Sequence, residues 1–178
     1  MRLAWPFRRD VTRDHAHALY VTLSEQARQP AFYGPGGVAD NVAGRFELVL
    51  LHAILVVRRL RRAGPSGEAL AQVVFDVLFD DMDRALREMG IADLAVAKRV
   101  KRLAAAFYGR AKAYEEALDL GADALAGPLE RNLFTGAAAE PQLLAAFARY
   151  ALEADRALAE QADAALLSGQ ARFPAPPA

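Results

Sequence analysis

The chain has 178 residues, of which 54% are hydrophobic and 25% charged, a length and composition typical of one globular domain with its own core. It contains no cysteine, which excludes disulfides, thiolate metal sites and thiol nucleophiles. The formal net charge is zero, so any electrostatic partner has to meet a local patch, and no nucleic-acid partner is expected.

Three segments are predicted along the chain: a flexible N-terminal segment over residues 1–11, a helical domain over residues 12–167, and a proline-rich tail over residues 168–178. The start has no apolar stretch long enough for a signal peptide, so export is not expected. It is either disordered or a weak interfacial anchor made by Trp5, Phe7, Arg8 and Arg9. The tail is expected to fray or to dock on the surface.

Capping residues, glycines and prolines divide the helical domain into six predicted helices. In chain order they run from Thr12 to before Gln29, from Asp40 to about Ala63, from Ser66 to Met89, from Asp93 to before Gly121, from Asp123 to Phe134, and from Pro141 to about Leu167. Short loops between amphipathic helices favour neighbours packed side by side. We therefore predict an all-α, compact single-domain bundle of about six helices with irregular crossings.

The second predicted helix is apolar on every side between Leu48 and Val57, interrupted only by His52. Such a helix is buried all round or faces a partner, and the central core position is the commoner case. A histidine among aliphatic residues is more often a satisfied core residue than a base. The arginines that follow are expected to face outward, as are two aromatics in the proline and glycine loop before the helix; these residues are Arg58, Arg59, Arg61, Arg62, Phe32 and Tyr33.

The third and fourth predicted helices carry charges of opposite sign. Basic residues follow the polar face of the fourth helix, and acidic residues follow the third, so the two sets either pair or present separate patches. Asp76 and Asp80 lie one turn apart, a spacing that prenyl-transferring helical enzymes use to hold magnesium. The only other pair of this spacing, Asp119 and Asp123, spans the break at Gly121. A magnesium-dependent prenyl-diphosphate enzyme therefore stays an alternative.

Three blocks of sequence resemble a known family. They are YGPGGVADNVAGRFELVLLHAILVVRRLR from Tyr33, FDVLFDDMDRALREMGIADLAVAKRVKRLAAAFYGRAKAYEEAL from Phe75, and LERNLF ending at Phe134. Read together, they are similar to the ubiquinol-cytochrome c chaperones, which assist assembly of the cytochrome bc complex. The chain departs from the family pattern at Ala97, where glycine is frequent, and the C-terminal helix lies outside the likeness.

The resemblance implies an all-helical, non-enzymatic chaperone without a cofactor that binds newly made cytochrome b, or an assembly intermediate containing it. The expected location is cytoplasmic, peripheral at an anionic membrane surface. The mitochondrial family member works with a companion subunit, and whether this chain has a companion assembly protein is left open. The family's characteristic positions include Phe75 and Phe107. The residues expected to contact the client or a partner are Phe32, Tyr33, Arg45, His52, Arg58, Arg59, Arg61, Arg62, Asp80, Asp83, Lys98, Arg99, Lys101, Arg102, Tyr108 and Arg110. A peripheral membrane adaptor unconnected with respiration is a further alternative.

Overall fold

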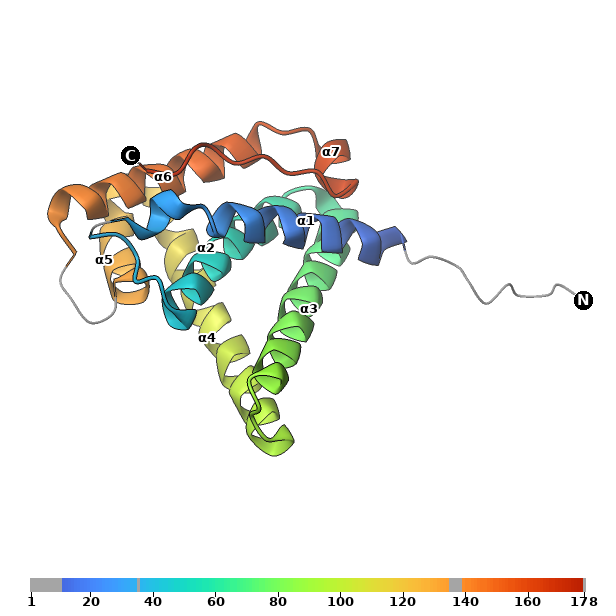
Figure 1. Ribbon diagram of the computed structural model, residues 1–178. Helices are drawn as coiled ribbons and strands as arrows, with labels where there is room; N and C mark the ends of the chain where they lie inside the picture. Colours follow the sequence, from blue (N-terminus) through green and yellow to red (C-terminus); the bar gives the residue numbers. More distant parts are fainter. Residues whose placement is uncertain (1–10, 35, 135–138, 178) are drawn as a thin grey trace, which may run out of the picture.

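The computed structural model describes residues 11–34, 36–134 and 139–177, and in these ranges the chain folds into helices with no strand (Figure 1). The elements are α1 (Val11–Ala27), the 3-10 helix η1 (Pro30–Tyr33), α2 (Val42–Arg61), α3 (Gly64–Glu88), α4 (Asp93–Leu120), α5 (Ala122–Leu133), α6 (Pro141–Ala159) and α7 (Asp163–Leu167). The all-α prediction is confirmed. The predicted N-terminal anchor lies outside the described residues.

Helix α2 is the centre of the core, as its apolar sequence predicts. It packs against α1, α3, α4, α5, α6 and α7, and from Leu50 to Leu60 its residues are all buried. Each aliphatic side chain buried here contributes about 1.5–3 kcal/mol relative to an exposed one. Figure 1 shows α1 and α6 on one side of α2, with α3 and α4 leading away from it on the other.

The start of α2 and the link to α3 differ from the predicted boundaries. Asn41, not Asp40, caps α2, because its side chain accepts a hydrogen bond of 2.9 Å from the amide of Gly44. Gly64 and Pro65 form the first turn of α3 instead of separating the helices, since proline is well tolerated there. The turn is tight at Gly67, where a Cβ atom would lie 2.0 Å from the carbonyl oxygen of Leu60.

The last predicted helix is in fact two helices, which raises the total to seven in the described ranges. Helix α6 ends at Ala159, and carbonyl groups of its last turn and of the residues after it have a partner outside the helix. Arg59 of α2 donates hydrogen bonds to the carbonyl oxygens of Leu158, at 2.9 Å, and Gln161, at 2.7 Å. An arginine distant in the sequence thus satisfies carbonyl groups at the end of this helix, where the local sequence shows no glycine or proline.

The tail docks on the body of the protein, one of the two predicted outcomes. The side chain of Gln161 accepts from the amide of Arg172 and donates to its carbonyl, both at 2.9 Å. Gln26 of α1 donates to the carbonyl of Pro174 at 2.9 Å. Phe173 packs edge-on against the ring of His52, with ring centroids 5.2 Å apart. The tail is thus part of the packed structure through residue 177.

Candidate functional site: a groove between α2, α3 and α4

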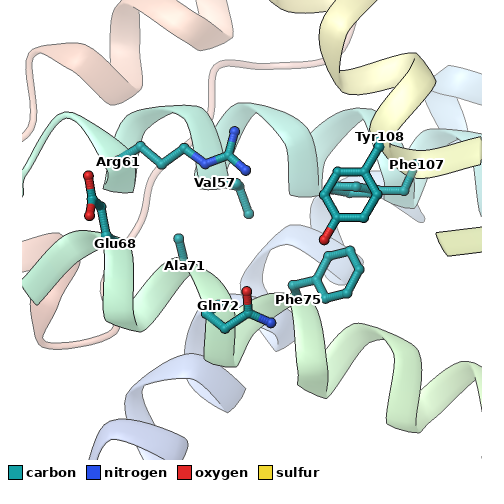
Figure 2. Close-up of a pocket in the computed structure, with 8 residues that line it drawn as sticks. All are labelled: Val57, Arg61, Glu68, Ala71, Gln72, Phe75, Phe107 and Tyr108. Carbon is teal, nitrogen blue, oxygen red and sulfur yellow. The ribbon is translucent and has the colours of Figure 1, made fainter. Parts of the chain in front are cut away.

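A groove opens where α3 and α4 diverge from α2. Its first part has a volume of about 280 Å³ and is lined by residues of all three helices (Figure 2). The lining residues are Val57, Arg61, Glu68, Ala71, Gln72, Phe75, Phe107 and Tyr108. A second hollow of about 390 Å³ shares Arg61 and Tyr108 with the first and continues along α4 to Asp119. The two hollows together form one groove on the outer face of α2 and α4.

Aromatic rings form one wall of the groove. Phe75 lies 5.2 Å from Phe107 in an edge-on arrangement and 5.4 Å from Tyr108 in a tilted one, measured between ring centroids. Phe107 is buried, Phe75 is half-buried, and Tyr108 is 53% exposed. Among the described residues Tyr108 is the one exposed aromatic side chain. Figure 2 shows the rings of Phe75 and Tyr108 converging at one end of the hollow.

Charged side chains form the opposite rim. Figure 2 shows Arg61 and Glu68 on the far side of the hollow from the aromatic rings. Arg61 also reaches Glu115 of α4, with Nη1 and Oε1 3.3 Å apart, and both partners remain partly open to solvent. Exposed ion pairs of this kind contribute little to stability and exchange easily with water. The groove thus combines an apolar wall with a solvated, charged rim, an arrangement suited to an extended partner that has apolar side chains.

Two arginines expected to face outward are buried instead, so that prediction is wrong for Arg58 and Arg59. Arg58 pairs with Asp155, with Nε and Oδ1 3.1 Å apart, and with Asp119. Arg59 pairs with Asp163 at 2.5 Å in addition to its bonds to α6 carbonyls. Their guanidinium groups tie α2 to α4, α6 and α7, because a buried charge is stable only when paired. Arg61 and Arg62 are exposed as expected.

The aromatic loop also differs from the expectation. Phe32 is fully buried, with its ring 5.1 Å from that of Tyr150 and 5.5 Å from that of His52. The 3-10 turn at Pro30–Tyr33 directs Phe32 into the core and leaves Tyr33 half-buried at the surface. The Tyr33 hydroxyl donates to the carbonyl of Ala27 at 2.6 Å, and Arg45 lies 5.7 Å over its ring. The loop therefore does not present Phe32 to a partner.

His52 is a satisfied core histidine, buried completely. Its Nδ1 lies 2.7 Å from the carbonyl oxygen of Leu48, which can only accept, so the hydrogen is on Nδ1. Nε2 then accepts from the hydroxyl of Tyr150 at 2.6 Å, and that hydroxyl in turn accepts from Gln26 at 3.0 Å. Burial lowers the pKa of His52 from 6.5 to about 4. The ring is neutral and unavailable to a client in this conformation.

The other candidate residues include some that are held in ion pairs and some that are exposed to solvent. Arg110 binds Glu47 through two hydrogen bonds of 2.7 and 2.6 Å, half-buried beside the groove, while burial of Glu47 raises the pKa of its carboxyl group. Arg45 pairs with Asp40 at 2.6 Å, which lowers the pKa of Asp40. Those exposed to solvent are Arg45, Arg61, Arg62, Asp80, Lys98, Arg99, Lys101, Arg102 and Tyr108. Their role in binding stays a prediction.

The predicted acidic and basic faces of α3 and α4 do not pair along their length. Asp80 pairs with Arg13 of α1 at 2.7 Å, and Asp83 pairs with Arg87 of its own helix at 2.6 Å. Asp76 accepts from Gln72 at 2.9 Å. In the described part of the chain no three His, Asp or Glu side chains are grouped so as to hold a metal ion. No observation of the site favours the magnesium-enzyme alternative.

Most residues of the groove wall are not among the contact residues predicted from the sequence. Phe75 and Phe107 were singled out by the family likeness, yet neither was included among the expected contact residues. Gln72 and Glu68 carry no signal in the sequence that separates them from any exposed helical residue. Within the residues described, no helix combines the length and the apolar character needed to cross a bilayer.

The fold and the groove define a helical protein with a solvent-open groove that has an aromatic wall and a charged rim. The model of the family described as ubiquinol-cytochrome C chaperone matches residues 36–173. The chain belongs to this family. The match includes the C-terminal helices and the first part of the tail, up to Phe173, which the sequence blocks alone did not cover.

A solved structure and two curated proteins are similar to this chain. The crystal structure of the Cbp3 homolog from Brucella abortus is 37% identical, with a TM-score of 0.82, and the match covers 92% of this chain and 90% of that one. The ubiquinol-cytochrome c reductase complex assembly factor 1 proteins of mouse and human are 21% and 22% identical over 132 residues, or 74% of this chain. The chain spans 45% and 44% of the lengths of these two relatives.

Proposed function

We propose that this chain holds an apolar segment of newly made cytochrome b in the groove between α2, α3 and α4 during biogenesis of ubiquinol-cytochrome c reductase. The family supplies the process, since its members are chaperones of this complex. The observation that carries the site is Tyr108, which is 53% exposed in the described part of the chain and whose ring lies beside that of the half-buried Phe75. Exposed aromatic rings beside a buried apolar surface are typical centres of protein interfaces.

The dimensions of the groove support a segment of polypeptide as the ligand. Each of its two hollows has room for a few side chains, and both are open to solvent along α4. The charged rim made by Arg61 and Glu68 keeps the groove wetted, so the empty chaperone does not expose a continuous apolar patch. An apolar client segment gains by covering Phe75 and Tyr108, and the rim allows its later release.

The location expected from the sequence and a companion protein belong to the same proposal. A chaperone of a membrane protein works where its client is inserted, which supports a peripheral position at the inner face of the cytoplasmic membrane. The exposed basic residues of α4 favour an anionic surface. A companion assembly protein is part of the proposal as well, and co-purification from native membranes in mild detergent is the measurement that detects one.

The test combines complementation with co-purification. In a strain that lacks the gene, we expect Tyr108→Ala and Gln72→Trp to lower the amount of cytochrome b bound to the chaperone by roughly tenfold, the effect of removing or blocking one good aromatic anchor. Assembled ubiquinol-cytochrome c reductase should fall with it. Gln72 is exposed at the mouth of the groove, so a tryptophan there fills the groove without disturbing the core.

Leu120→Ala is the matched control, because Leu120 lies on the same helix, is 82% exposed and is outside the groove. It should leave both measurements unchanged. Normal cytochrome b binding by both groove variants would refute the groove as the client site. Normal assembly of the complex in the deletion strain itself would refute the function, and would leave the peripheral adaptor unconnected with respiration as the better explanation.

A further inference from the structure

The turn between α3 and α4 forms a firmly held tip that projects away from the rest of the protein. Figure 1 shows α3 and α4 converging there, far from α1 and α6. Gly90, with φ +77°, closes α3: its amide donates to the carbonyl of Arg87 at 2.9 Å, and the amide of Ile91 donates to the carbonyl of Leu86 at 3.2 Å. This is the Schellman arrangement, which needs a residue such as glycine at positive φ.

A charge bridge adds to the order of the tip. The guanidinium group of Arg87 binds Asp83 on its own helix, at 2.6 Å, and Asp93 at the start of α4. The two helix ends are therefore linked across the turn. The side chains displayed at the tip are held in place by a closed backbone and an ion pair.

The tip displays apolar side chains to solvent. Leu94 is 91% exposed, the highest value among the large hydrophobic residues described, and Met89 is 54% exposed. Ile91 between them is partly exposed. Single exposed leucines are common on protein surfaces, but these apolar residues lie within six positions of one another at the turn where α3 and α4 meet.

Directly behind the apolar tip, α4 presents a stripe of cations. Lys98 and Lys101 follow Leu94 at spacings of four and seven residues, so all three lie on one face of the helix, and Arg102 borders it. Arg99 adds a fourth positive charge around the helix. All four basic residues are exposed, and within the described ranges none lies within ion-pair distance of a carboxylate.

The order of these features along the helix distinguishes among partners. Phosphates of a nucleic acid would use the cations but leave Leu94 and Met89 exposed to water. A lipid bilayer uses both, because apolar side chains enter the boundary region while lysine and arginine reach the phosphates above it. The zero net charge of the whole chain also removes the long-range attraction that favours nucleic acid.

We propose that the α3–α4 tip, Met89 to Leu94 with the basic stripe of Lys98, Arg99, Lys101 and Arg102, is a docking site for an anionic lipid surface. The apolar residues enter the headgroup boundary, and the cations bind lipid phosphates. This inference deepens the proposed membrane location and rests on it for its setting. It concerns a surface separate from the client groove, so the two can fail independently.

The experiment is vesicle flotation of the full chain. Vesicles of phosphatidylcholine with phosphatidylglycerol should bind the protein at low salt, and pure phosphatidylcholine should not. A basic residue near an anionic surface contributes about fivefold to binding, so Lys98→Gln/Lys101→Gln should weaken it by at least about tenfold. Leu94→Ser should weaken binding to the anionic vesicles at low salt as well, because the apolar contribution is lost while the four cations remain.

The control is Leu120→Ser, which removes an equally exposed leucine from the opposite end of α4 and should bind vesicles as the wild type does. Circular dichroism melting checks that each variant is folded. Equal vesicle binding by the wild type and the tip variants would overturn the proposal. Binding to single-stranded RNA, but not to anionic vesicles, that is lost in the lysine variant would replace it by a nucleic-acid surface.

Measuring client binding distinguishes the lipid site at the tip from the client site in the groove. The tip variants leave Phe75, Phe107 and Tyr108 untouched, so in detergent extracts they should retain cytochrome b as the wild type does. Vesicle binding lost with client binding retained supports a separate lipid site. Loss of client binding from detergent extracts by the tip variants would show that the tip is part of the client surface and not a lipid site.

Discussion

His52 makes the stability of this protein depend on pH in a predictable way. The neutral ring completes a buried chain of hydrogen bonds from the carbonyl of Leu48 through Tyr150 to Gln26. Protonation would place a second N–H against the Tyr150 hydroxyl, whose hydrogen now points at the ring. Burial of this charge is the main reason that the pKa falls from 6.5 to about 4.

The direction in which stability changes with pH follows from the number of protons bound in the folded and unfolded states. Between pH 6.5 and 4 the unfolded chain binds a proton at His52 and the folded chain does not, so the stability rises with pH in this window. The contribution is fully present above the unfolded pKa and is lost as the pH falls towards the folded one. One unit of pKa corresponds to about 1.4 kcal/mol, so His52 costs about 2 kcal/mol between pH 7 and pH 5.

Urea unfolding of the wild type and of His52→Gln at several pH values from 7 to 5 measures this contribution. Glutamine keeps a donor and an acceptor but does not titrate. Because it lacks the packed ring of His52, we expect this variant to be less stable than the wild type at pH 7. Its free energy of unfolding should nevertheless fall by about 2 kcal/mol less than that of the wild type between pH 7 and 5. The carboxylates and the other two histidines, His15 and His17, are common to both proteins, so their contributions cancel. Equal changes of the unfolding free energy with pH in the two proteins would contradict a buried, neutral His52.

Two other sites give predictions for thermal or urea unfolding. Gly67→Ala should destabilise the protein by about 2–4 kcal/mol, because the new Cβ would lie 2.0 Å from the carbonyl oxygen of Leu60 and the backbone has to move; the matched change Gly109→Ala meets nothing within 4 Å and should stabilise α4 by about 0.5–1 kcal/mol. Arg59→Lys should cost about 1–3 kcal/mol, since an ammonium group cannot reach two carbonyls and a carboxylate together. Arg62→Lys, at an exposed pair 3.8 Å apart, should change stability by less than about 0.5 kcal/mol.

The sequence predicts the core helix but not which of its arginines are buried. A helix that is apolar on every side over this length is expected to lie at the centre of the fold. Arg58 and Arg59 become buried because Asp155 and Asp163, about a hundred residues later, come to lie beside them. No local pattern reveals such a pairing. The same limit applies to the end of α6, where Arg59 binds the carbonyl groups and the sequence shows no glycine or proline.

The sequence predicts the helices that form the candidate site but not how these helices are arranged around it. The basic face of α4 follows from residue spacing alone. The groove exists because α3 and α4 diverge from α2 by an amount that depends on packing across the whole bundle. The burial of Phe32 has a similar origin: a short 3-10 turn rotates the side chain between α2 and α6, where it contacts Tyr150 and Phe147. Composition indicates a loop at this point but not its direction.

One helix carries both proposed surfaces, and this limits what the groove can hold. Leu94 at the tip and Tyr108 in the groove lie on the same face of α4, fourteen residues and therefore about 21 Å apart. With the tip at the headgroups and α4 standing away from the bilayer, the groove lies in water, well outside the hydrocarbon. It then binds a client segment before that segment enters the bilayer, or a loop that stays outside. A segment already spanning the membrane cannot reach Tyr108 in this orientation.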